Sequence, residues 1–201
     1  MIIDRMTDEE IRDEARREYN VVWAHVQRLI PQCRRPVIKA NKFPIYFKPV
    51  EYISKRRNHY IIYLEARCKA DYNNMLVTVI CTYDRGGKHA LMFVKPPYYD
   101  VNIYSPHLFS RYRTRFLKDE SISPVEVMNR FFKINPTIHM LFTGDEEIAG
   151  VCNEGVLLGI VKDNNIFVWK TYLSFNILFE DQIDFKEGIH EALIKYREEL
   201  Q

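Results

Sequence analysis

Apolar residues recur at helical spacing near the start of the chain. Thr7 and Glu10 form a capping-box pattern, and the acids of "TDEE" sit where they oppose the helix dipole. The apolar positions that follow are three or four residues apart: Ile11, Ala15, Tyr19, Val22, Val26 and Leu29. The pattern predicts a helix over residues 7–30, ended by Pro31, that packs on a sheet or on a partner subunit.

Residues 43–95 change to a pattern typical of strands. Segments 43–53, 59–69, 74–84 and 88–96 are rich in β-branched and aromatic residues, and "SKRRN", "ADYNN" and "RGG" separate them as turns. The short separations favour an antiparallel meander. Residues 100–105 indicate one more short strand.

The remaining residues predict two helices, then strands, then a helix. Ser105 and Ser123 are good N-caps, each followed by proline, so helices are expected over 106–118 and from 124 to about 133. Strands are expected at 138–143, 147–152, 155–161 and 165–174, and a helix at 185–200. The order predicts an α+β fold with antiparallel sheet. It divides at 1–100 and 101–201, or forms one continuous domain.

Composition and charge narrow the class of protein. The net charge is +2 over 201 residues, yet residues 34–57 are strongly basic and residues 176–201 are acidic. The basic segment is either a site for a polyanion or surface charge that the acidic tail complements. The four cysteines are far apart, with no CxxC pair and no histidine at ligand spacing, so neither a metal nor a cofactor is expected. Neither a signal peptide nor a membrane-spanning run is found, which predicts a cytoplasmic protein.

The segment "SPHLFSRYRTRF" carries the clearest candidate chemistry. On a helix, His107, Arg111 and Arg115 fall in one row with steps of about 6 Å, beside an apolar row that begins at Leu108. Guanidinium groups grip phosphate oxygens, and imidazole transfers protons near neutral pH. RNA supplies its own nucleophile, the 2′-hydroxyl, so its cleavage needs no metal. The alternative is an ordinary surface helix whose arginines pair with acids.

Three stretches, "HLFSRYRTRF", "SISPVEVMNRFF" and "VWKTYLS", resemble the barnase–EndoU–colicin–RelE-like group of metal-independent RNases, and its phage and mobile-element branches in particular. The resemblance covers residues 103–175, and about 100 residues precede it, unlike the compact toxins of that group. It implies that His107 is the general base or acid and that Arg111 and Arg115 contact the phosphate. It also implies that Thr171 completes the catalytic site, with Lys170 or Tyr172 as nearby alternatives for binding substrate. Strand alternation would place Lys170 and Tyr172 on one face and Thr171 on the other.

A second basic cluster lies at the start of a predicted strand. Arg56, Arg57 and His59 would extend an RNA track, with Tyr60 and Tyr63 as stacking surfaces. The alternative is a polar turn before a strand. The sequence thus predicts a metal-independent endoribonuclease-like protein acting on RNA. The competing hypothesis is a non-catalytic adaptor that binds nucleic acid, a protein partner, or a second copy through the N-terminal helix.

Overall fold

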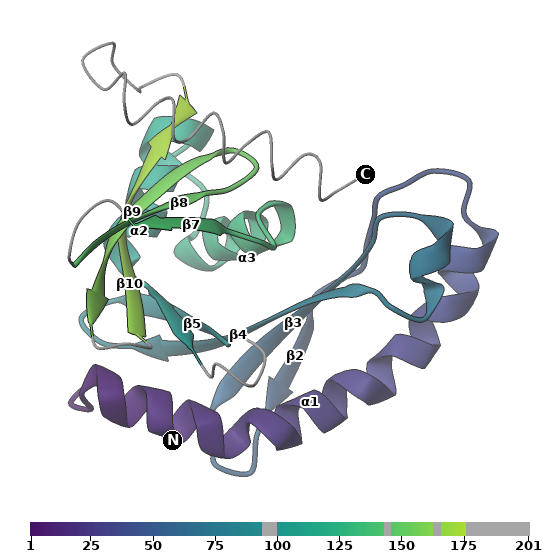
Figure 1. Cartoon of the computed structure of the whole chain (residues 1–201), viewed down its shortest axis with the longest axis horizontal. Coiled ribbons are helices and arrows are strands. Elements are labelled where there is room, and N and C mark those ends of the chain that lie inside the picture. The colour runs from purple at the N-terminus through teal and green to yellow at the C-terminus, as the bar shows by residue number, and fades with distance from the viewer. Residues whose placement is uncertain (94–99, 143–145, 163–165, 176–201) are drawn as a thin grey trace. The chain divides into compact units, whose positions relative to one another are not determined.

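The computed structural model describes residues 1–93, 100–142, 146–162 and 166–175. The chain divides into two compact units, Met1–Ile103 (the first unit) and Tyr104–Gln201 (the second unit). The predicted α+β class is confirmed: a long helix near the N-terminus, a central pair of helices and mostly antiparallel strands are present (Figure 1). The expected helix at 185–200 lies outside the described residues.

The first unit begins with helix α1, Asp8–Lys39, whose start follows the predicted capping box. The backbone N–H of Glu10 donates to the Thr7 hydroxyl over 3.3 Å, and the Thr7 N–H donates to the Glu10 carboxylate over 2.8 Å. Asp8, Glu9 and Glu10 occupy the first turn, where their charge stabilises the helix dipole.

The predicted end of this helix at Pro31 is wrong. Helix α1 runs through Pro31 and Pro36 to Lys39 as one long, curved element (Figure 1). Each internal proline costs about 3 kcal/mol because it removes a backbone N–H and crowds the preceding turn. Both prolines lie on the exposed side, whereas Ile30 and Val37 on the opposite side are buried. Burial of that apolar side favours helix beyond the point where local propensity would end it.

The strands of the first unit form the predicted meander. They are β1 (Ile45–Tyr46), β2 (Val50–Ile53), β3 (His59–Ala66), β4 (Leu76–Asp84), β5 (Lys88–Phe93) and β6 (Val101–Tyr104), whose last residue belongs to the second unit, with the 3₁₀ helix η1 (Lys69–Tyr72) between β3 and β4. Their order is β1-β3-β4-β5-β6, and β2 also pairs with β3. The segment predicted as one strand at 43–53 is therefore two short strands along the same edge of β3, interrupted at Pro49.

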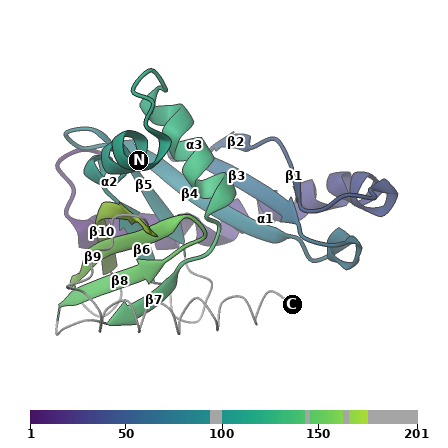
Figure 2. The same cartoon turned by 90° about the horizontal axis from the view of Figure 1, so that it is seen from above.

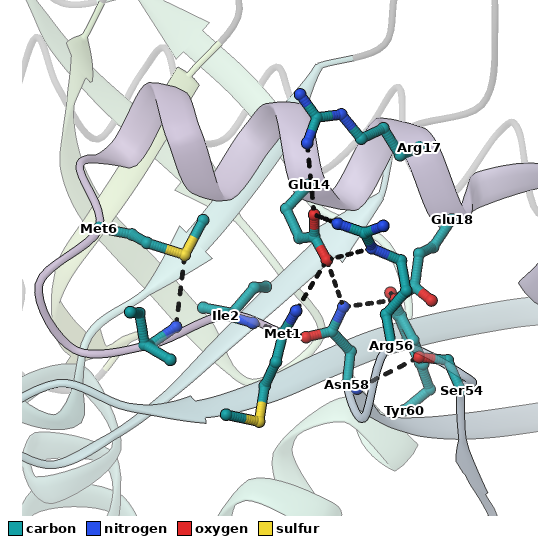
Figure 3. A network of polar contacts seen from close by, with 11 residues as sticks. Met1, Ile2, Met6, Glu14, Arg17, Glu18, Ser54, Arg56, Asn58 and Tyr60 are labelled. Carbon is teal, nitrogen blue, oxygen red and sulfur yellow. Dashed lines mark hydrogen bonds and ion pairs between the residues drawn. The ribbon is translucent and has the colours of Figure 1, made fainter.

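A buried polar network docks α1 on the β2–β3 hairpin (Figure 3). Arg56 donates from Nε and Nη2 to the two oxygens of the Glu14 carboxylate, over 2.6 and 2.7 Å. Asn58 Nδ2 donates to Glu14 over 3.2 Å and to Glu18 over 2.5 Å. The Tyr60 hydroxyl donates to Glu18 over 2.8 Å. Because both carboxylates are buried, this donor set fixes the face that α1 turns toward the strands.

The second unit packs two short helical segments and a further helix with an antiparallel sheet (Figure 2). Its elements are α2 (Pro106–Arg111), the π-helix η2 (Tyr112–Leu117), α3 (Pro124–Ile134), β7 (His139–Phe142), β8 (Glu147–Val151), β9 (Gly155–Lys162) and β10 (Ile166–Ser174). The strand order is β10-β9-β8-β7. Edge-to-face contacts among aromatic rings fill the core, including Tyr112 with Phe131 at 5.2 Å and Tyr112 with Tyr172 at 5.0 Å.

Glu154, in the turn between β8 and β9, is the common acceptor of a second polar network at the edge of this core. Arg130 Nη2 donates to it over 2.8 Å and Asn135 Nδ2 over 3.1 Å, and the Tyr112 hydroxyl also donates to the carboxylate. The next residue, Gly155, must lack a side chain, because a Cβ there would lie 2.3 Å from the Leu173 carbonyl oxygen. The network joins α3 and η2 to the β8–β9 turn.

The Glu14 network predicts acid sensitivity of the fold. Chiefly through the hydrogen bond from Arg56, the pKa of Glu14 is lowered from 4.5 to about 2. A lowered pKa stabilises the native state above the ordinary pKa, and that stability is lost as the pH falls toward about 2. Between pH 7 and pH 3, the free energy of unfolding of the wild-type chain should therefore fall by about 2 kcal/mol more than that of Glu14→Gln.

Urea unfolding at the two pH values measures this margin. Asp4→Asn, at an exposed position of the same unit, is the control and should give a margin near zero. An equal loss of stability for Glu14→Gln at both pH values would contradict the assignment.

Candidate functional site

The predicted row of His107, Arg111 and Arg115 (the His107 row) lies along α2 and η2. His107 is exposed, and both arginines are half-exposed. Arg111 Nε donates a hydrogen bond to His107 Nε2 over 3.1 Å, one turn away. The structure thus brings the first two members together, as their spacing predicts.

The helix that carries the row is not the uniform α-helix expected over 106–118. It changes to a π-helix at Tyr112 and ends at Lys118, which has the left-handed φ of 53°. A π-helix closes hydrogen bonds from residue i to residue i+5, and such turns are frequent at functional sites. In this wider turn, residues four or five apart share a face, so Arg115 follows Arg111 along the same side.

Ser105 attaches the start of α2 to strand β10. Its backbone N–H donates to the Trp169 carbonyl over 3.0 Å, and its hydroxyl donates to the Lys170 carbonyl over 3.2 Å. The same hydroxyl accepts from the Leu108 N–H as N-cap. His107, two residues beyond Ser105, is therefore held beside the part of β10 that the sequence singled out.

A β-bulge at Lys170 changes which residues of β10 face outward. The pairing steps from Trp169 with Gly159 to Thr171 with Leu158, which leaves Lys170 as the extra residue. Lys170 is exposed and Thr171 half-exposed, whereas Trp169 and Tyr172 are both fully buried. The predicted alternation, with Lys170 and Tyr172 on one face, is therefore wrong.

Tyr172 belongs to the core and not to a substrate surface. Its ring is fully buried, and its hydroxyl donates to the Glu154 carbonyl over 2.6 Å. Burial raises its pKa well above the ordinary value for tyrosine. Of the three candidate residues on β10, Lys170 and Thr171 keep access to solvent.

The residues of the second basic cluster, Arg56, Arg57 and His59, lie in the first unit and have different partners. Arg56 is the partner of Glu14, which raises the pKa of Arg56. His59 is half-exposed, with Nδ1 2.9 Å from the Thr82 hydroxyl and Nε2 3.1 Å from Glu51. Arg57 is exposed at a turn with φ of 61°. This placement agrees with a polar turn before a strand and leaves Arg57 as the cluster's outward cation.

The predicted stacking surfaces beside this cluster are absent. Tyr60 and Tyr63 are buried at 0% and 6% exposure, since β3 is covered on both faces. Neither ring is available to a base.

The guanidinium groups of the His107 row differ from those that hold the fold together. Arg56, Arg85 and Arg130 each meet a carboxylate, at 2.6, 2.5 and 2.8 Å. Among the residues that the structure describes, no carboxylate lies within 4 Å of Arg111 or Arg115. The row therefore presents its positive charge to solvent in the described part of the chain.

Sequence reasoning missed Glu154, the acceptor at the centre of the second unit. No local pattern in the sequence marks this acid. Its partners Tyr112 and Arg130 lie 42 and 24 residues away in sequence. With its acceptors occupied by core side chains, Glu154 serves the fold.

No group of three or more His, Cys, Asp or Glu side chains suited to a metal ion occurs within the described ranges. None of the described helices is both long enough and apolar enough to cross a membrane. No protein-family model matches the chain, and comparisons with curated proteins and with solved structures give no significant match.

The hydrogen bond between Arg111 and His107 fixes a tautomer. Because Arg111 Nε is a donor, the neutral imidazole must accept at Nε2 and carry its proton on Nδ1. ¹⁵N NMR of neutral His107 should therefore show the Nδ1–H form, and Arg111→Gln should shift the population toward Nε2–H. Arg115→Gln is the control and should leave the tautomer unchanged; a shift of the same size there would refute the pairing.

Proposed function

We propose that this protein is a metal-independent endoribonuclease that acts on RNA at the His107 row. One observation supports this most directly: an imidazole hydrogen-bonded to one guanidinium, with a second on the next turn, and no carboxylate within 4 Å among the described residues. Charge that is not used to stabilise the fold is available for a phosphate.

The proposed reaction is attack of the RNA 2′-oxygen on the adjacent phosphorus. The 2′-O–P bond forms, the P–O5′ bond breaks, and a proton moves from the 2′-hydroxyl to the leaving oxygen. Arg111 turns from His107 to the phosphate, which frees Nε2 of His107 to take the first proton. Arg111 and Arg115 then stabilise the charge that develops on the phosphate oxygens.

The β10 side chains beside the start of α2 would complete this site. Thr171 offers a hydroxyl donor and Lys170 a mobile positive charge, from adjacent positions at the bulge. Arg57 and His59, in the first unit, would bind further phosphates of a longer RNA. Arg56 is left out because its guanidinium already stabilises Glu14.

The expected result is cleavage of single-stranded RNA in the presence of EDTA. General acid–base catalysis contributes about a hundred- to ten-thousand-fold in rate, so His107→Ala and Arg111→Ala should each lower kcat by about that factor. A fluorescent oligonucleotide resolved on a denaturing gel measures the rate. The same oligonucleotide with 2′-deoxyribose throughout should stay intact.

The matched control is His139→Ala, which removes a histidine from β7 of the same unit and should cut at the wild-type rate. RNA that stays intact after long incubation at high protein concentration would overturn the nuclease proposal and favour the non-catalytic adaptor.

A further inference from the structure

The part of α1 beyond Pro31 carries a basic surface that the helix predicted from the sequence does not include. Residues 19–50 contain six Lys or Arg and no Asp or Glu. If the helix ended at Pro31, most of these cations would lie in a loop. Because α1 continues to Lys39, four of them are on one helix: Arg28, Arg34, Arg35 and Lys39.

Three of these cations share the outward face of the helix. Arg28, Arg35 and Lys39 are related by steps of i+7 and i+4, which return to the same side at 3.6 residues per turn. All three are exposed. The opposite side carries the buried Ile30 and Val37. Arg28, Arg35 and Lys39 are called the basic stripe here, and they span about 16 Å at 1.5 Å per residue.

The basic stripe has no counter-charge within the described part of the chain. Earlier on the same helix, Arg16 and Arg17 lie 3.9 and 3.7 Å from Asp13 and Glu14. No carboxylate of the described residues is within 4 Å of Arg28, Arg35 or Lys39. Only Lys39 lies in the last turn, where a cation stabilises the helix dipole, so the two arginines gain little from it.

We propose that the basic stripe binds the phosphate backbone of single-stranded RNA, independently of base sequence. The choice of RNA rests on the proposed function, whereas the stripe itself rests on the geometry of α1. A row of exposed like charges raises the local potential and attracts a polyanion. The stripe lies in the first unit and the His107 row in the second. The role assigned to the stripe is to retain substrate, with no part in the chemistry.

An anionic membrane is the other partner that a basic helix can attract. Helices that lie in a membrane surface present a broad apolar face beside the charged one. The apolar face of α1 is buried within its own unit, and its exposed large apolar side chains are Val21 and Ile38. That exposed apolar area is too small to insert, which favours RNA.

The test compares two triple variants in the full chain, each made together with His107→Ala so that the RNA stays intact. The first is Arg28→Gln/Arg35→Gln/Lys39→Gln, in which glutamine keeps helix propensity. The control is Arg5→Gln/Arg12→Gln/Lys88→Gln, which removes the same net charge elsewhere in the first unit. Circular dichroism confirms that both remain folded. Fluorescence anisotropy with a labelled single-stranded RNA gives Kd over a range of salt concentrations.

Each phosphate contact on a single strand contributes about 0.7 to the slope of log K against log salt. The stripe variant should therefore lose about 2 from that slope and bind at least about tenfold more weakly at low salt, while the control changes little. Equal loss in both variants, or no RNA binding by the parent protein, would overturn the proposal. So would binding to vesicles of anionic lipid that depends on the stripe and occurs without RNA binding.

Failure of this proposal can be told apart from failure of the proposed function. If the chain binds RNA through the stripe but does not cleave it, the RNA-binding role of the stripe is supported and the proposed nuclease function is wrong. If cleavage occurs, the stripe variant with His107 intact should raise KM and leave kcat unchanged. A fall in kcat with KM unchanged would place these residues in the chemistry and overturn the proposal.

Discussion

The hydrogen bonds that Arg56 and Asn58 donate to Glu14 determine how α1 lies on its unit. A buried carboxylate without donors would cost several kcal/mol, so rotation of the helix away from this arrangement is strongly disfavoured. With the orientation of α1 set in this way, its buried side continues toward the C-terminal end of the helix through Val26, Ile30 and Val37. Arg28 and Arg35 lie about four and about six helical turns beyond Glu14, opposite that buried side, and both are exposed.

In the second unit a comparable constraint comes from the single extra residue in β10. The bulge at Lys170 lets both Trp169 and Tyr172 point into the core, which strict alternation forbids. It also turns Lys170 outward and offers carbonyl groups that Ser105 reaches with its backbone and hydroxyl. Core packing and the placement of α2 therefore depend on the same irregularity, and the surroundings of His107 depend on both.

Local signals in the sequence predicted what local physics decides. Thr7, Ser105 and Ser123 each cap the helix expected of them, and the spacing of His107 and Arg111 predicted their contact. Predictions failed where distant residues decide. The rule that proline ends a helix reflects only the local cost of proline. It does not include the free energy gained when Val37 is buried by tertiary contacts. Tyr60 and Tyr63 looked like surface rings because no pattern within β3 shows that both faces are covered. The partner of Arg56 lies 42 residues away in sequence, and no composition rule identifies it.

Arginine has two uses in this chain, and the distinction bears on function. Where a buried or half-buried carboxylate is in reach, as for Arg56, Arg85 and Arg130, the guanidinium stabilises the fold and is unavailable to a ligand. In the His107 row and the basic stripe, the described residues offer no such partner. Like charges placed in a row repel one another and contribute nothing to folding that a glutamine could not. An anion that binds across the row converts this repulsion into affinity, and a phosphate backbone, with charges at regular intervals, matches such a row better than a single ion does.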